Sequence, residues 1–298
     1  MQFLTHLDPK EATGVVISVG FFVMYFVEMA AGRIFSTRRP LRDTFFTLAG
    51  MSAHVFLSGP IIGLAAGWVV LQIWPSESGA LAHIGFWPAF AALFFADEFL
   101  HYWLHRYAHE WRWLWKIHRT HHTAMNMNVG VAFRYNIFWV LLLPQAWLSA
   151  FALYVGQGEA LMAALLITFF VNVLTHASFR WDLALRRRFP WSEGFWFVLE
   201  HLVTLPDTHH AHHAYGKSAH PNGNYAVTVF LFDVLFGTAK FPRQEQATFG
   251  LPISSRLHWA EELFWPIVRK SLLPRPDKIG ADARIDQSSR AKFFNRSS

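Results

Sequence analysis

Most of the 17 histidines in this chain lie in three short clusters with helical spacing. The first cluster repeats at i, i+4 and i+8, and the others at i, i+3 and i+4, so each cluster places three rings on one helix face. The three sets are His101, His105 and His109; His118, His121 and His122; and His209, His212 and His213. His210 points roughly 100° away from His209 on an ideal helix. His176 stands alone, four residues after Asn172.

So many imidazoles indicate a transition-metal site, because imidazole nitrogen binds iron, copper, zinc and nickel. Eight or nine rings exceed what one ion can use, whereas two ions with four or five nitrogen ligands each would use them all. The zinc motif H-E-x-x-H fails, since Trp113 stands where the second histidine should be. The Glu-x-x-His pair of carboxylate di-iron proteins needs two copies, and only Glu98 and His101 form one.

Other metal chemistry is excluded by the composition of the chain. Haem requires only one or two axial histidines, and the absence of cysteine excludes iron–sulfur clusters and thiolate zinc sites. What remains is an all-histidine dinuclear iron site at a membrane surface. Such a site could activate O2 and abstract hydrogen from an unactivated C–H bond.

Further polar residues could support or extend this site. Metal-bound histidines usually donate their second ring N–H to a carboxylate or a carbonyl. The acidic candidates are Asp97, Glu98, Glu110, Asp207 and Asp233. We favour Asp97 and Glu98, which lie about one turn before His101. The possible additional ligands or supporting groups are His101, His201, Asn172 and Asn224, and Arg106 and Arg134 could pair with lipid phosphate or with the acids.

The composition and the apolar runs of the chain are typical of a membrane protein. The chain has 298 residues, of which 53% are hydrophobic and 15% charged, against about 25% charged in ordinary soluble domains. A helix that crosses a bilayer needs about 20 apolar residues. Five apolar runs approach this length, at residues 15–32, 44–74, 84–96, 137–155 and 160–174.

The basic residues predict the topology of these runs. Every lysine and arginine except Lys10 lies in the 33–43 loop, in residues 101–135 or after residue 177. Because basic loops stay in the cytoplasm, this predicts five crossings with the N-terminus outside. The alternative treats residues 44–74 as a re-entrant pair hinged at Pro60. All the histidine clusters fall on the cytoplasmic side in the five-crossing topology.

We therefore predict an all-α fold, a polytopic membrane helical bundle with a cytoplasmic, histidine-rich helical cap that holds a dinuclear metal site. The predicted parts are transmembrane helices with about three crossings (1–100), histidine-box helices (101–135), a transmembrane hairpin (136–177), a cytoplasmic cap with the third box (178–273) and a flexible tail (274–298). Within the cap, residues 256–270 are predicted to form an amphipathic helix on the bilayer surface.

About half of the chain, residues 97–240, resembles the fatty acid hydroxylase/sterol desaturase superfamily of integral-membrane di-iron oxygenases. The resemblance lies in the boxes HYWLHRYAH, WKIHRTHH and PDTHHAHH, in the isolated His176, and in the closing segments NYA and FDVLFGT. It implies two iron ions, O2 as co-substrate and nine ligands: His105, His109, His118, His121, His122, His176, His209, His212 and His213. His101 and NYA are similar to the sterol C4-methyl oxidase branch, whereas MNVGVAFR at 127–134 is similar to the alkylglycerol monooxygenase branch.

The expected reaction is hydroxylation or desaturation of a C–H bond in a membrane lipid or sterol-like substrate. The chain has no dinucleotide fingerprint and no haem-attachment pattern. We therefore expect a separate electron donor, a ferredoxin or a cytochrome b5-like protein with its reductase, and no nucleic-acid partner. The alternative is a membrane metal transporter or metal-binding protein. A transporter should carry ionisable residues near the bilayer midplane, where only Glu28 and His54 are candidates.

Overall fold

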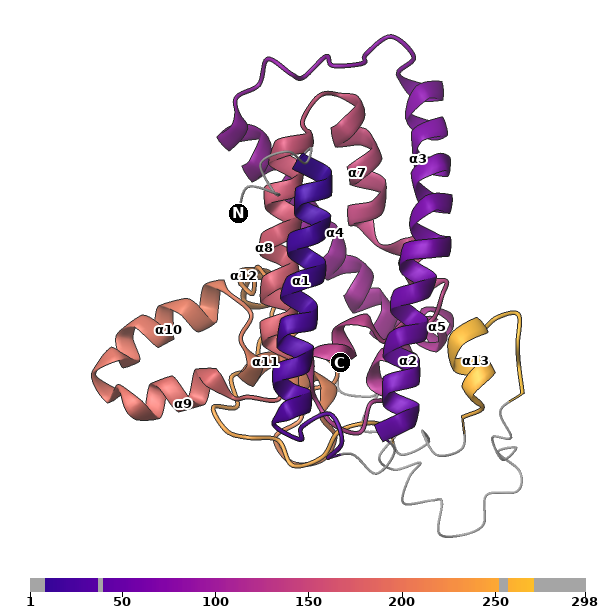
Figure 1. The fold of residues 1–298 in the computed structure, drawn as a ribbon. Helices are drawn as coiled ribbons and strands as arrows, with labels where there is room; N and C mark the ends of the chain where they lie inside the picture. The colour runs from indigo at the N-terminus through magenta and orange to yellow at the C-terminus, as the bar shows by residue number, and fades with distance from the viewer. Residues whose placement is uncertain (1–8, 37–39, 252–256, 271–298) are drawn as a thin grey trace.

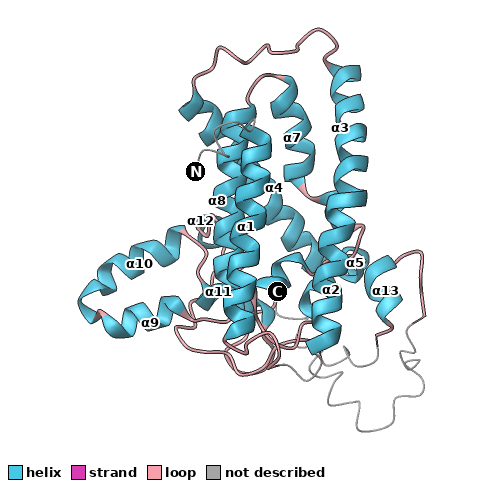
Figure 2. Cartoon of the chain, viewed as in Figure 1, coloured by secondary structure: helices cyan, strands magenta, loops and turns pink. Residues whose placement is uncertain are grey.

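The computed structural model describes residues 9–36, 40–251 and 257–270, and these ranges contain helices and loops but no strand (Figure 2). The all-helical prediction is therefore confirmed for these residues. The longer helices are α1 (Pro9–Ala30), α2 (Pro40–Ala53), α3 (Gly59–Ile73), α4 (Phe86–Glu110), α5 (Arg112–His122), α7 (Pro144–Tyr154), α8 (Gly158–His176) and α10 (Glu193–Leu202). The shorter ones are α6 (Trp139–Leu142), α9 (Trp181–Arg188), α11 (Pro206–His213), α12 (Leu231–Leu235) and α13 (Trp259–Phe264).

The long helices run side by side and separate two ends of the molecule (Figure 1). Helix α8 packs against both α1 and α4, and α3 packs against α7. The loop that follows α3 lies at one end, while α5, α9, α11 and α13 gather at the other (Figure 1). The segments in which the sequence concentrates its basic residues and its histidines therefore meet at a single end of the bundle.

Within the described residues, two helices are long and apolar enough to cross a membrane, Pro40–Ile73 and Gly158–His176, and a shorter apolar helix covers Gly14–Ala30. The Pro40–Ile73 helix buries only 18% of its most apolar stretch inside the protein. Large apolar side chains such as Phe56, Leu64 and Trp68 are exposed on its surface. An outer surface of this kind suits a lipid environment, and the five-crossing topology stays a prediction.

The Pro40–Ile73 helix does not turn back at Pro60, so the predicted re-entrant alternative is wrong. A single widened turn at His54–Ser58 joins α2 to α3, and the N–H of Gly59 donates to the carbonyl of His54. Proline has no N–H to give to the preceding turn, and a π-type turn of this kind accommodates the defect without ending the helix.

Two predicted boundaries differ from the structure. The apolar run at 137–155 does not form one helix, because Pro144 begins a new one and leaves α7 with 11 residues, a length of about 16 Å. The boundary between residues 100 and 101 falls inside α4, which has 25 residues and carries both the third apolar run and the first histidine cluster.

The predicted surface helix at 256–270 is shorter than expected and is anchored to the protein. Helix α13 covers Trp259–Phe264, and its two carboxylates, Glu261 and Glu262, are buried against α5. Trp259 and Ile267 are exposed, as the prediction required. The tail at 274–298 lies outside the described residues.

Candidate metal centre

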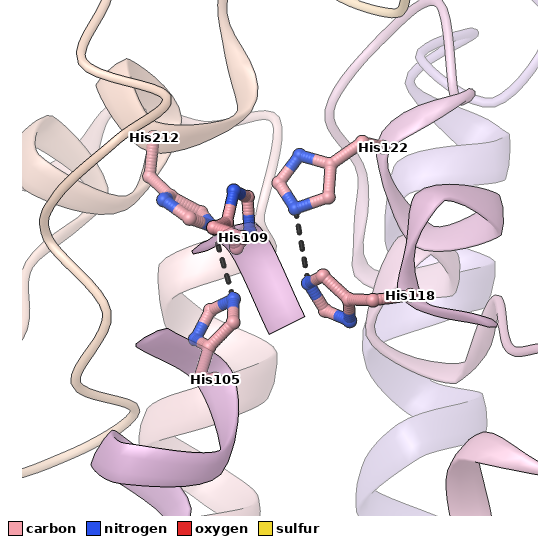
Figure 3. Close-up of side chains that lie close together, drawn as sticks. All are labelled: His105, His109, His118, His122 and His212. Carbon is pink, nitrogen blue, oxygen red and sulfur yellow. Dashed lines mark hydrogen bonds between the residues drawn. The ribbon is translucent and has the colours of Figure 1, made fainter. Parts of the chain in front are cut away.

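Four helices bring the nine histidines named in the resemblance together in two adjacent groups. The five-histidine group consists of His105, His109, His118, His122 and His212, and the four-histidine group of His121, His176, His209 and His213. Within each group, one ring nitrogen of every member lies within 4.8 Å of those of all the others. Figure 3 shows the five-histidine group, contributed by α4, α5 and α11.

The two groups share a boundary. The ring centroids of His122 and His213 lie 4.4 Å apart in a stacked arrangement, and those of His121 and His213 lie 4.5 Å apart. Helix α5 supplies one group with His118 and His122 and the other with His121. These three rings are neighbours because positions i, i+3 and i+4 share a face of the helix. Two metal positions would therefore be neighbours.

Main-chain carbonyl groups fix the orientation of several rings. The Nδ1 atom of His105 donates to the carbonyl of Tyr225 over 2.6 Å, and that of His212 to the carbonyl of Gly223 over 2.8 Å. His109 bonds to the carbonyl of Pro221. We call residues 221–225 the carbonyl loop. The carbonyl of Asn172 accepts a hydrogen bond from Nδ1 of His176 over 2.7 Å.

The contact between His105 and His212 tests whether these residues fit a metal ion. Both Nδ1 atoms donate to carbonyls, so each neutral ring presents a lone pair at Nε2. The two Nε2 atoms are 3.1 Å apart (Figure 3). Two facing lone pairs repel each other, and a shared cation removes this repulsion. Buried Nε2 of His109 has no hydrogen-bond partner either. The donor set thus fits metal ions.

The rings on α5 and α11 are held in their neutral form. Burial lowers the pKa of each of them well below its usual range, and the neighbouring imidazoles lower it further. A neutral imidazole is the form that binds a metal, because protonation would remove the lone pair. The site is therefore prepared for cations at neutral pH.

Glu98 and Asp233 form hydrogen bonds with groups around the site and not with the ligand rings. Both carboxylate oxygens of Glu98 are occupied, one by the Thr168 hydroxyl at 2.8 Å and the other by the N–H groups of Thr228 and Val229. Asp233 accepts from the N–H groups of Tyr225 and Ala226. Asp233 thus reaches His105 only through the backbone of the carbonyl loop.

Two of the remaining acidic candidates, Glu110 and Asp207, are also engaged elsewhere. Glu110 pairs with Arg106, and Asp207 pairs with Arg180. Buried Oδ1 of Asp97 has no hydrogen-bond partner. Both oxygens of Glu98 bond elsewhere, so the prediction that Glu98 orients a ligand ring is wrong, whereas the same role for Asp97 stays a prediction. Carbonyl groups orient several of the rings in the described structure.

The possible additional ligands lie outside both groups. His201 on α10 stacks on Phe241 and donates to the Phe197 carbonyl, away from the two groups. His101 lies one turn before His105, with ring centroids 6.3 Å apart. His210 packs against Phe249, as expected for a ring off the ligand face.

Asn224 joins α11 to the chain that follows the carbonyl loop. Its side-chain amide donates to the carbonyls of Thr208 and Lys240, and its oxygen accepts from the Lys240 N–H. Its backbone has a positive φ of 57°, which asparagine tolerates better than most residues. Asn224 therefore contacts the backbone of the helix that carries the third cluster.

A buried charged network supports α5 from behind. Arg134 is almost fully buried and donates to Asp43, to the Thr120 carbonyl and to the Thr123 hydroxyl. The Thr123 hydroxyl also donates to Glu262 over 2.6 Å. Among the described residues, Arg134 pairs with Asp43 and Glu262 and with none of the five acidic candidates. No pattern in the sequence indicates this network, because Asp43 and Glu262 are far from Arg134 along the chain.

A small cavity of about 50 Å³ adjoins the two groups on the side of the long helices. We call it the site cavity. Its wall includes five of the nine histidines: His105, His118, His121, His176 and His209. The other lining residues include the apolar Trp139, Leu143 and Val227 and polar residues of α4, α7 and α8. A substrate atom in this cavity would lie next to both metal positions.

The comparisons with known proteins agree with the histidine boxes. A family profile described as fatty acid hydroxylase matches residues 90–238, which is half of the chain. Alkylglycerol monooxygenase of Xenopus tropicalis is 27% identical over 246 residues, covering 78% of this chain and 49% of that protein. The Danio rerio protein of the same name is 26% identical over 240 residues, covering 72% and 48%.

The Homo sapiens alkylglycerol monooxygenase is 26% identical over 170 residues, covering 55% of this chain and 33% of that protein. The chain spans about half the length of the first two relatives. No solved structure gives a significant match. The family profile extends from the apolar part of α4 through all three boxes to Thr238, and confirms the resemblance found in the motifs. The chain therefore belongs to the fatty acid hydroxylase family.

Proposed function

We propose that this protein is a membrane-bound oxygenase that inserts one oxygen atom of O2 into a C–H bond of a lipid. The five-histidine and four-histidine groups would each hold one iron ion. The observation that carries the proposal is the convergence of nine neutral imidazoles from four helices into two adjacent groups. When bound, the iron pair supplies the activation of O2 that an unactivated C–H bond requires.

The residues of the chain prepare the site for this reaction. The carbonyl loop orients His105, His109 and His212, so their Nε2 atoms stay free to bind. Trp139 packs against His118, with ring centroids 4.3 Å apart, and contributes to the site cavity. These apolar walls exclude water from the reacting carbon, which protects a strong oxidant from wasteful reactions.

The names of the relatives favour hydroxylation over desaturation and a lipid with an alkyl–glycerol linkage as substrate. Electrons would come from a separate donor protein of the ferredoxin or cytochrome b5 type. The end of the bundle that carries the histidines is also the basic end, so we assign it to the cytoplasm and expect an acidic donor to bind there.

A role in metal transport has less support. Glu28 accepts hydrogen bonds from the N–H groups of Val129 and Ser178, so its carboxylate joins α1 to loops near the histidine end. All nine histidines lie at that same end and do not form a path across the bundle. This arrangement suits an oxygenase better than a metal transporter.

The test is metal analysis together with product analysis of the purified protein. We expect about two iron ions per chain. Supplied with an alkylglycerol, an electron donor and heavy-oxygen-labelled O2, the protein should form a product that contains the label. A protein that binds no iron, or that carries metal across vesicles without consuming O2, would contradict the proposal.

A further inference from the structure

We infer that the site cavity binds a hydroxyl group of the lipid substrate and that Gln145 on α7 is the residue that accepts its hydrogen bond. This inference rests on the proposed function and adds to it a substrate class, a lipid that carries a free hydroxyl group close to the carbon that is oxidised. It also identifies a specificity-determining residue outside the histidine boxes.

The cavity places Gln145 beside the histidines. Gln145 and His101 line it together with rings from both histidine groups. A volume of about 50 Å³ admits a few water-sized groups, so only the reacting end of a lipid fits. A polar group bound by Gln145 would therefore be within a few bonds of the carbon next to the metal positions.

Two polar groups of the cavity wall, the Thr168 hydroxyl and the Asn172 main-chain carbonyl, are already engaged. The Thr168 hydroxyl donates to Glu98, and the Asn172 carbonyl accepts from His176. By contrast, Oε1 of Gln145 and Nδ1 of His101 are buried and have no hydrogen-bond partner. A buried polar atom without a partner is energetically unfavourable, so a ligand that satisfies these atoms gains affinity.

The type of the free atom selects the ligand. The amide oxygen of Gln145 can only accept a hydrogen bond, so it requires a donor. A hydroxyl group supplies one, whereas an ether oxygen or a hydrocarbon chain does not. His101 can donate to the oxygen of the same hydroxyl group, since a neutral imidazole carries one N–H. The two residues together therefore match an alcohol.

The test compares two ligands that differ only in this hydrogen bond. One is a long-chain alkylglycerol with free hydroxyl groups, and the other is the same compound with its hydroxyl groups O-methylated. Binding is measured by the ligand-induced rise in Tm of the detergent-solubilised full chain, which needs no turnover. We expect the free alcohol to bind about tenfold more tightly to the wild type.

Gln145→Met keeps a side chain of similar length without its hydrogen-bonding groups, and should remove most of this tenfold preference. Gln244→Met is the matched control, because Gln244 bonds to Ser218 on the exposed surface, and it should keep the preference. Turnover should show the same pattern, with a KM about tenfold higher in Gln145→Met for the free alcohol and a smaller change in kcat.

Equal binding of the two ligands to the wild type would overturn the inference even if Gln145→Met did not fold. A preference that persists in Gln145→Met would also overturn it, because another residue would then recognise the hydroxyl. Failure of the proposed function would be seen separately, as selective binding of the alcohol without any incorporation of labelled oxygen.

Discussion

Arg119 and Glu261 form an ion pair in which a guanidinium nitrogen lies 2.6 Å from a carboxylate oxygen, and both side chains are almost fully buried. The pair joins α13 to the face of α5 that does not carry the ligand rings. Breaking one partner leaves the other charge buried and uncompensated, at a cost of about 3–5 kcal/mol.

We therefore expect Glu261→Ala to lower the free energy of unfolding by several kcal/mol and to reduce the metal content, because α5 carries three of the nine rings. Thermal denaturation and metal analysis measure the two effects. Glu245→Ala is the control, since Glu245 pairs with Arg187 on the exposed surface and should change stability by less than about 1 kcal/mol. Equal effects of the two variants would show that α13 does not support α5.

The separation of the histidines into two groups predicts a graded loss of metal. His118→Ala removes a nitrogen from the five-histidine group, so we expect about one iron ion per chain to remain and product formation to fall by at least about 100-fold. His201→Ala is the matched control, because His201 stacks on Phe241 away from both groups. Loss of iron in His201→Ala would contradict the placement of the site.

The buried histidines predict a dependence of stability on pH. Burial lowers the pKa of the ligand rings on α5 and α11 well below its usual range, whereas the unfolded chain takes up protons near pH 6.5. The unfolded state therefore binds more protons below this pH. The free energy of unfolding of the metal-free protein should fall as pH decreases from about 7.5 to 5.5, by up to about 1.4 kcal/mol per pH unit for each ring.

His210 separates this proton linkage from metal binding. It is buried, its pKa is also lowered well below the usual range by burial and then by the charge of Arg180, and it belongs to neither histidine group. His210→Gln should reduce the slope of the free energy of unfolding against pH by the contribution of one imidazole. It should leave the iron content unchanged. Stability that does not vary across this pH range would rule out the linkage.

Substitutions of Asn224 test how much the hydrogen bonds of the carbonyl loop contribute to the stability of the protein. Asn224→Ala removes its hydrogen bonds to Thr208 and Lys240 and places an alanine at positive φ, so we expect a loss of about 3 kcal/mol. Asn224→Gly removes the same hydrogen bonds but tolerates the backbone conformation, and should lose about 1 kcal/mol less. Ser218→Ala provides a control at a partly exposed position with a similar φ of 67°. Thermal denaturation distinguishes the three variants.

The local geometry of the site could be predicted from the sequence. Helical spacing of His118, His121 and His122 determines which rings share a face, and it needs no knowledge of the rest of the fold. The carbonyl groups that orient the rings could not be predicted, because every residue has one. Tyr225 meets His105 only after about 120 residues of intervening chain have folded, and acidic side chains were favoured because they alone are visible in a sequence.

Errors in the helices also have physical causes. Apolar composition predicted one long helix at 137–155, but Pro144 has no N–H to continue it. Composition also predicted one helix over residues 256–270, but α13 covers only Trp259–Phe264. The partners of Glu261 and Glu262 lie on α2, α5 and nearby loops, and such distant pairings leave no periodic pattern in the chain.

The network behind α5 reaches beyond the segment that defines the family. That segment covers residues 90–238, whereas Asp43 and Glu262, which contact Arg134 and Thr123, come from either side of it. A truncation to the family segment would retain all nine rings, yet would leave the buried Arg134 without its counter-charges Asp43 and Glu262. The smallest piece worth expressing therefore begins before α2 and ends after α13.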